Sequence, residues 1–125
     1  MATTISIAYA QAVATNILQN SYVGLIRQDG SECPIGRVAF GDVVVDATSD
    51  PNYIVLSNLN DVVFPIASID VAPMTNPVVQ VALYNADSGG NLLVKTDIVR
   101  KPYLAGDKFK IPAGWLQFKI QKVVP

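Results

Sequence analysis

Hydrophobic and polar residues alternate along much of the chain, which is the pattern of β-strands with one buried face. The alternation is clearest in the C-terminal third, residues 78–123, where apolar residues occupy every second position in three runs: Val79, Val81 and Leu83; Phe109 and Ile111; and Leu116, Phe118 and Ile120. Residues 92–99 are predicted to pair with the first run. We expect this third to fold back on itself as an antiparallel sheet with an apolar side and a basic side.

Turn residues separate these runs. Asp87-Ser88-Gly89-Gly90 tolerates positive φ and allows a sharp reversal, and Leu104-Ala105-Gly106-Asp107 and Pro112-Ala113-Gly114 predict two more turns. The residues that we expect to define these turns are Asp87, Gly89, Gly90, Leu92, Gly106, Asp107, Pro112 and Gly114.

The N-terminal residues 3–20 predict a helical arm. Thr3 or Thr4 can cap it, Asn20-Ser21 can end it, and one face would carry Ile5, Tyr9, Ala12, Val13 and Ile17. Such a helix either covers one end of its own sheet or docks as an arm on an adjacent subunit, because a short helix alone is marginal in water.

The middle of the chain predicts several short strands. They cover residues 22–28, 53–56 and 62–64, and residues 31–45 form either two short strands or one bent strand. Asp29-Gly30 is a hairpin turn signal, and residues 66–77 read as an extended crossover. The fold class is therefore mainly β. We expect one domain over residues 1–125, an antiparallel two-sheet β-sandwich, immunoglobulin-like or jelly-roll, with a short N-terminal α-helix.

The composition does not say where the many apolar residues are buried. Half of the residues are hydrophobic and only 15% are charged, yet no apolar run reaches the ~18 residues that cross a bilayer. The excess is buried in a dense β core or between subunits. The single cysteine, Cys33, excludes an internal disulfide, and no signal peptide opens the sequence. These features suit assembly in the bacterial cytoplasm.

Charge is distributed unevenly. Residues 1–94 hold two arginines against eight acidic residues, and residues 95–125 hold seven basic residues against two acidic ones. The basic side includes Lys108, Lys110 and Lys119. It is a solvated strand face that blunts edge pairing, or it complements the acidic part of another copy. Few aromatics interleave with these lysines, which argues against nucleic acid as a partner.

The sequence predicts no catalytic site, no cofactor and no metal. It has no histidine and one cysteine, which removes the commonest general base and the commonest zinc ligands. Asp42, Asp46 and Asp50 recur every four residues, whereas calcium loops place ligands at alternate positions and close with a glutamate. We therefore expect solvated loop carboxylates.

Several motifs resemble one protein family. They are Asp87-Ser88-Gly89-Gly90-Asn91-Leu92-Leu93, Ala105-Gly106-Asp107 and Ile111-Pro112-Ala113-Gly114 with Leu116, preceded by Tyr22-Val23-Gly24-Leu25, by Glu32 with Arg37 to Phe40, and by Asn58 with Phe64-Pro65. This set resembles a family of small tailed-bacteriophage proteins usually labelled tail-fibre protein. Two loops depart from the family pattern, at Cys33-Pro34-Ile35-Gly36 and at Met74-Thr75-Asn76-Pro77.

The resemblance implies a non-enzymatic structural protein of a tailed-phage virion. It would be a tail-fibre or appendage subunit, or a capsid decoration (cement) subunit, assembled in the host cytoplasm. Its partners would be copies of itself, with a trimer as one arrangement, and other phage structural proteins, but no membrane. Candidates for partner contact are Ile5, Tyr9, Lys108, Lys110 and Lys119.

The alternative function is a carbohydrate-binding β-sandwich module for host attachment. Its stacking platform would come from Tyr22, Tyr53, Tyr84, Tyr103 and Trp115. Aromatic residues at alternating strand positions more often belong to the core, and we expect Trp115 to pack against the hairpin.

Overall fold

The computed structural model describes residues 6–122. Along this part of the chain, one helix is followed by nine strands: α1 (Ile7–Gln19), β1 (Tyr22–Arg27), β2 (Val38–Ala39), β3 (Val43–Asp46), β4 (Tyr53–Asn58), β5 (Val62–Val63), β6 (Val78–Tyr84), β7 (Leu92–Lys101), β8 (Lys110–Ile111) and β9 (Gln117–Gln121). The strand pairs are antiparallel. The predicted fold class, mainly β with a short N-terminal helix, is confirmed.

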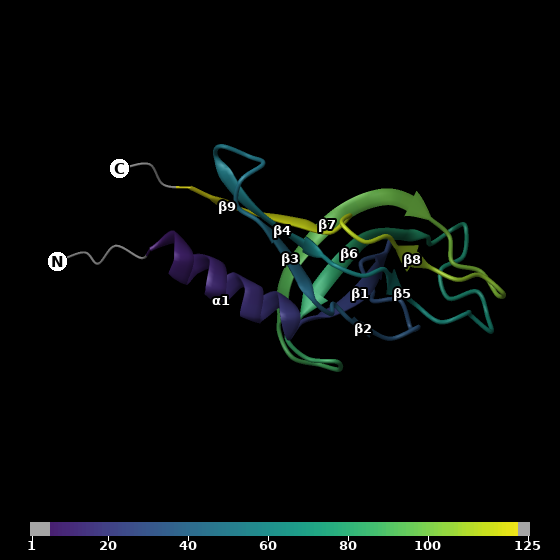
Figure 1. Ribbon diagram of the computed structural model, residues 1–125. Coiled ribbons are helices and arrows are strands. Elements are labelled where there is room, and N and C mark those ends of the chain that lie inside the picture. The colour runs from purple at the N-terminus through teal and green to yellow at the C-terminus, as the bar shows by residue number, and fades with distance from the viewer. Residues whose placement is uncertain (1–5, 123–125) are drawn as a thin grey trace.

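The strands form two sheets and a small ribbon (Figure 1). The first sheet has the order β2-β1-β6-β7, the second has the order β3-β4-β9, and β5 pairs with β8 in the ribbon. One cluster of buried side chains takes residues from both sheets and from the ribbon, so the arrangement is a β-sandwich with its core between the layers. Residues 31–45 were expected to form either two short strands or one bent strand. They form two short strands, β2 and β3, which lie in different sheets.

The C-terminal third does not form one sheet of its own, and that expectation is wrong. Among its described residues, 78–122, the β6–β7 hairpin is the one strand pair formed within it, whereas β8 pairs with β5 and β9 pairs with β4. A period of two identifies the buried face of a strand but says nothing of its partner. The three runs therefore supply strands to all three layers and hold the earlier part of the chain together.

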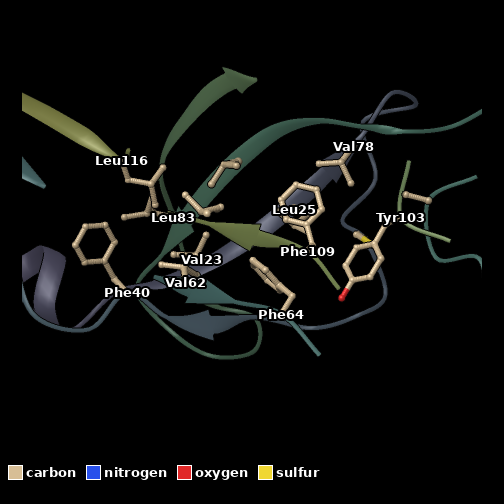
Figure 2. Close-up of a cluster of buried hydrophobic side chains, with 14 of the residues drawn as sticks. Val23, Leu25, Phe40, Val62, Phe64, Val78, Leu83, Tyr103, Phe109 and Leu116 are labelled. Carbon is tan, nitrogen blue, oxygen red and sulfur yellow. The ribbon is translucent and has the colours of Figure 1, made fainter. Parts of the chain in front are cut away.

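The centre of the core is built on apolar residues from neighbouring strands of the first sheet (Figure 2). Val23 and Leu25 of β1 and Leu83 of β6 are fully buried, as the alternation predicts for Leu83. Val79 departs from the pattern and is half-buried, because the register between β6 and β7 shifts between Val78 and Gln80 and turns Val78 inward instead.

Three aromatic side chains close the core at the end of the molecule away from α1 (Figure 2). Phe109 meets Phe64 edge-on with ring centroids 6.0 Å apart, and it stacks on Tyr103 at 5.6 Å. The Tyr103 hydroxyl donates to the carbonyl of Pro65. Aromatic pairs of this geometry add roughly 0.5–1.5 kcal/mol each beyond the burial of their area. They tie Phe64 and Pro65, at the start of the crossover (residues 66–77), to the C-terminal third.

Helix α1 packs on the sandwich with a face that the sequence did not predict. It begins at Ile7 behind Ser6, whose hydroxyl oxygen accepts a hydrogen bond from Tyr9 N; Thr3, Thr4 and Ile5 lie outside the described residues. Leu18 and Ala14 pack against the core. The predicted face is largely open to solvent: Tyr9, Val13 and Ile17 are 62%, 40% and 46% exposed.

The prediction failed there because the helix is apolar around most of its circumference, so its period does not select one face. The α1 helix carries no charged residue and projects from one end of the strands (Figure 1). The helix therefore covers one end of its own sandwich through Leu18 and Ala14, whereas the face with Tyr9, Val13 and Ile17 stays open to solvent.

Candidate functional site

The loop between β6 and β7, residues 85–91, is held by Arg37 from outside the hairpin. The Arg37 guanidinium donates through Nε and Nη2 to the two carboxylate oxygens of Glu32, at 3.0 and 2.9 Å. Its Nη1 donates to the carbonyls of Ala86 and Gly89, both at 2.8 Å. Only 8% of the Arg37 side chain is exposed. Two-pronged charge-assisted bonds of this kind fix both position and orientation.

We call Arg37 and Glu32, which hold the loop, the loop clamp. Tyr84 and Gly24 also contribute to it. The guanidinium carbon of Arg37 lies 3.5 Å from the centroid of the Tyr84 ring. The hydrogen bonds that Arg37 donates to Glu32 raise the pKa of Arg37, and burial, with Glu32 nearby, raises the pKa of Tyr84. Gly24 makes room for the cluster, because a Cβ there would lie 3.0 Å from the Tyr84 ring and 3.2 Å from Glu32 Oε2.

The second turn, residues 104–107, is anchored to the crossover. Asp70 Oδ1 accepts a hydrogen bond from Ala105 N at 2.8 Å, and Gly106 N donates to the carbonyl of Ala67 at 2.7 Å. Asp107 Oδ2 accepts from Leu104 N at 3.0 Å and closes the turn itself. The turn is thereby fixed to a segment some 35 residues earlier in the chain.

The third turn, residues 112–114, is pinned by Asn58, whose side chain is buried. Its Nδ2 donates to the carbonyl of Pro112 at 3.1 Å, and its Oδ1 accepts from Leu116 N at 3.0 Å. The Asn58 carbonyl accepts from Gly114 N at 2.8 Å. Asp61 Oδ1 accepts from Ala113 N on the exposed side, also at 2.8 Å.

The turn motifs therefore serve the architecture of the fold. Each of the three turns is held by side chains or carbonyls from earlier in the chain. Glu32, Arg37 and Asn58 belong to the motifs that the sequence singled out. The parts played by Tyr84, Asp61 and Asp70 were missed, because hydrogen bonds between distant segments leave no local signal.

The two glycines of the first loop, Gly89 and Gly90, differ in the space around them, so we expect substitution by alanine to lower stability unequally. Both have positive φ, +65° at Gly89 and +67° at Gly90. A Cβ at Gly90 would lie 2.4 Å from Asn85 Oδ1 and 2.8 Å from Ala86 Cβ, whereas a Cβ at Gly89 meets nothing within 4 Å.

We expect Gly89→Ala to destabilise the protein by about 1 kcal/mol, from left-handed strain alone. Gly90→Ala should cost roughly 1–2 kcal/mol more, because the loop must also move. Urea unfolding of both variants measures the difference. Equal losses would show that the loop is not held in the described conformation.

A groove of about 550 Å³ opens between β7 and the β8–β9 segment. Its floor is apolar and its rim is polar and basic. Residues of the floor include Val81, Ile98, Phe109, Ile111 and Leu116, and residues of the rim include Asp97, Arg100, Lys101, Lys110 and Trp115. The groove exists because β7 and β9 are edge strands of separate sheets, so the two layers are not joined on this side.

Trp115 stands at the rim of this groove and is 76% exposed, so the expected packing against the hairpin is wrong. The five aromatic residues do not share a surface either. Tyr103 is fully buried, Tyr84 lies under Arg37, and the Tyr53 ring faces Lys119 Nζ at 5.4 Å. Of the predicted platform, Trp115 is the member that the groove could use for stacking.

The predicted partner-facing residues lie on several elements. Lys108 is exposed after the second turn, Lys110 of β8 forms a surface ion pair with Asp61 at 3.7 Å, and Lys119 is exposed on β9. Tyr9 is exposed on α1, and Ile5 lies outside the described residues. The structure does not gather them into one patch.

The carboxylates of the β3–β4 loop cap that loop. Asp46 Oδ1 accepts from Thr48 N and Ser49 N, and the Ser49 hydrogen bonds lower the pKa of Asp46 to about 2. Asp50 Oδ1 accepts from Asn52 N and Tyr53 N. Among residues 6–122, no group of three or more acidic, cysteine or histidine residues is arranged to hold a metal.

A membrane-spanning helix is not found in the described part of the chain, where α1 is too short to cross a bilayer.

Comparison with known proteins identifies the family of this mainly β chain. The model of a family described as "Podophage GP4 fiber I protein gp80" matches residues 10–119. The chain belongs to this family of phage fibre proteins. The predicted resemblance to phage tail-fibre proteins is confirmed, and the family implies a virion-associated protein that contacts other virion proteins. No curated protein and no solved structure matches the chain significantly.

Proposed function

We propose that the chain is a non-enzymatic structural subunit of a tailed-phage virion that assembles with copies of itself and with other particle proteins. The observation that carries the proposal is that its buried polar side chains hold the backbone in place. The buried ones among the described residues, Ser21 and Asn58, bond to backbone, and the Glu32–Arg37 pair holds a loop. These groups shape a rigid surface, which suits contact with a partner.

Exposed apolar side chains supply surfaces for that contact. The exposed stripe on α1, formed by Tyr9, Val13 and Ile17, lies at one end of the molecule. The crossover lies near the other end, and its residues Ile66, Ile69 and Met74 are 65%, 63% and 73% exposed. Apolar groups left open to this extent commonly mark interfaces. We propose that residues 1–125 act as one domain whose arm, residues 3–20, contacts an adjacent subunit.

The family supports a fibre role, and the specific place in the particle is part of our proposal. A tail-fibre or appendage subunit is the role that we propose, with capsid decoration as the other role that a small sandwich with an arm can fill. A homo-oligomer, such as a trimer, fits both. Cys33 is buried, so folding needs no oxidising compartment and can take place in the host cytoplasm.

Particles lacking this protein test the proposal. Purified full-length chain, added to such particles, should cosediment with them saturably, and electron microscopy should show it at the tail. Saturable binding to the head shell would move the role to decoration. Absence of binding to particles, together with turnover of a virion polymer, would contradict a structural function.

A carbohydrate-binding role is the second candidate, favoured by Trp115 beside Thr96 and Arg100 in the groove. An exposed indole near hydrogen-bonding side chains suits stacking against a sugar ring. If this role is correct, host polysaccharide should change Trp115 fluorescence saturably, and Trp115→Ala should abolish binding without changing the melting temperature. Unchanged fluorescence over a panel of host glycans would reject it.

A further inference from the structure

Strand β7 has an unpaired edge. It is ten residues long and stands last in the order β2-β1-β6-β7, so β6 is its one neighbour in the described structure. Most of its residues are exposed, and only Val94 and Ile98 are half-buried. A long exposed edge offers free backbone donors and acceptors to another strand, and natural proteins usually shorten or cover such an edge.

The two faces of β7 are set by its pairing with β6. Thr96 lies opposite Val81, which is buried, so Val94, Thr96 and Ile98 lie on the core side. Lys95 and Asp97 lie on the outer side, where Asp97 Oδ1 accepts a hydrogen bond from Gln80 Nε2 at 3.0 Å. The carboxylate is therefore held in place on the open face.

The sequence of β7 is complementary to itself in one antiparallel register. With Thr96 opposite Thr96 of a second copy, each Lys95 lies opposite an Asp97, and each Val94 lies opposite an Ile98. Opposite charges and apolar side chains in directly facing positions stabilise a strand pair. Four of the five matched positions, Val94 to Asp97, lie in the regular part of β7, and Ile98 is the first residue of the stretch where the register with β6 shifts, between Asp97 and Lys101.

Neighbouring registers lack this match. A shift of the two-fold axis by one residue places Lys95 opposite Lys95, or Asp97 opposite Asp97, and like charges in facing positions are destabilising. A register centred between two residues would pair the outer side of one strand with the core side of the other. Thr96 is therefore the position on which a symmetric pair would centre.

We propose that two copies of this chain pair through their β7 edges, antiparallel about a two-fold axis at Thr96, and so join two four-stranded sheets into one. This inference rests on the self-association in the proposed function and assigns it a surface. The groove beside β7 is then continued across the axis into the second copy, which covers part of its apolar floor.

A cysteine at the axis tests the geometry. Facing residues of an antiparallel pair have Cα atoms roughly 4.5–5.5 Å apart, within the range that a disulfide bridges. Thr96→Cys should therefore form a covalent dimer under mild oxidation, in nearly full yield. The wild-type chain should not, since Cys33 is buried, and neither should Gln117→Cys, on the exposed part of β9.

Charge exchange tests the register independently. Lys95→Asp and Asp97→Lys should each weaken self-association roughly 10-fold or more, because each variant creates two like-charged pairs across the axis. The double variant, with both changes, should restore it. If Lys95 instead protects the edge against pairing, Lys95→Thr would strengthen association, and that result would overturn the proposal.

The outcomes separate this inference from the proposed function. If the chain associates but Thr96→Cys does not cross-link and the charge variants behave as wild type, β7 pairing is wrong while self-assembly through another surface stands. If the wild-type chain remains monomeric at every concentration, both the β7 pair and self-association are refuted. Circular dichroism of each variant shows that the changes leave the fold intact.

Discussion

Asn58→Ala should lower the free energy of unfolding by about 3 kcal/mol. The amide is buried and holds the third turn through Pro112 and Leu116. Its removal leaves Leu116 N and the Pro112 carbonyl without this partner, and each buried unsatisfied group costs about 1–3 kcal/mol. Chemical denaturation by urea, followed by Trp115 fluorescence and circular dichroism, measures the loss.

Asp61→Ala is the matched control for Asn58→Ala. Asp61 bonds the same turn, through Ala113 N, but it is exposed. Removing an exposed hydrogen bond and the surface ion pair with Lys110 should cost less than about 1 kcal/mol. If the two variants lose the same stability, the buried amide does not pin the turn.

Arg37→Ala should also destabilise the protein strongly, by about 3 kcal/mol, because it strands the Glu32 carboxylate and frees the carbonyls of Ala86 and Gly89. Removing one partner of a largely buried ion pair typically costs 3–5 kcal/mol, and the partial exposure of Glu32 places the expected value at the lower end. Thermal unfolding measures the total loss. Hydrogen exchange should in addition show faster exchange in residues 85–91.

Two further variants interpret the Arg37 result. Arg37→Lys keeps the charge but cannot make the forked contact, so it should recover less than half of the lost stability. Arg100→Ala is the control, since Arg100 is exposed and makes one 3.3 Å bond to Gln28. It should cost no more than about 0.5 kcal/mol. Wild-type stability of Arg37→Lys would contradict the clamp.

The sequence predicted local features of the fold well. Alternation located β6, β9 and the buried residues Ile111 and Leu116, and the glycine and proline clusters marked the reversals. These signals are local, because the period of a strand and the φ of a turn depend on neighbouring residues. The partners of β8 and β9 could not be predicted, since β8 pairs with a segment 47–49 residues earlier in the chain and β9 with one 60–68 residues earlier.

The surface features were harder to predict. Trp115 and the Tyr9–Val13–Ile17 stripe carry the residue types of a core, and nothing in their spacing indicates that the structure leaves them exposed. The motif residues Arg37 and Asn58 were found through the family pattern, but their hydrogen-bond partners emerged only from the fold. Gly24 illustrates the limit: its need for a small side chain is set by Tyr84, which lies 60 positions further along.

The central claim is that this protein functions by assembling with copies of itself and with other proteins. Sedimentation equilibrium of the full chain over a wide concentration range tests it most directly. The expected result is a mass that is an integer multiple of the monomer mass and falls towards the monomer on dilution. A monomer at the highest concentration reached, with no binding to particles that lack the protein, would contradict it.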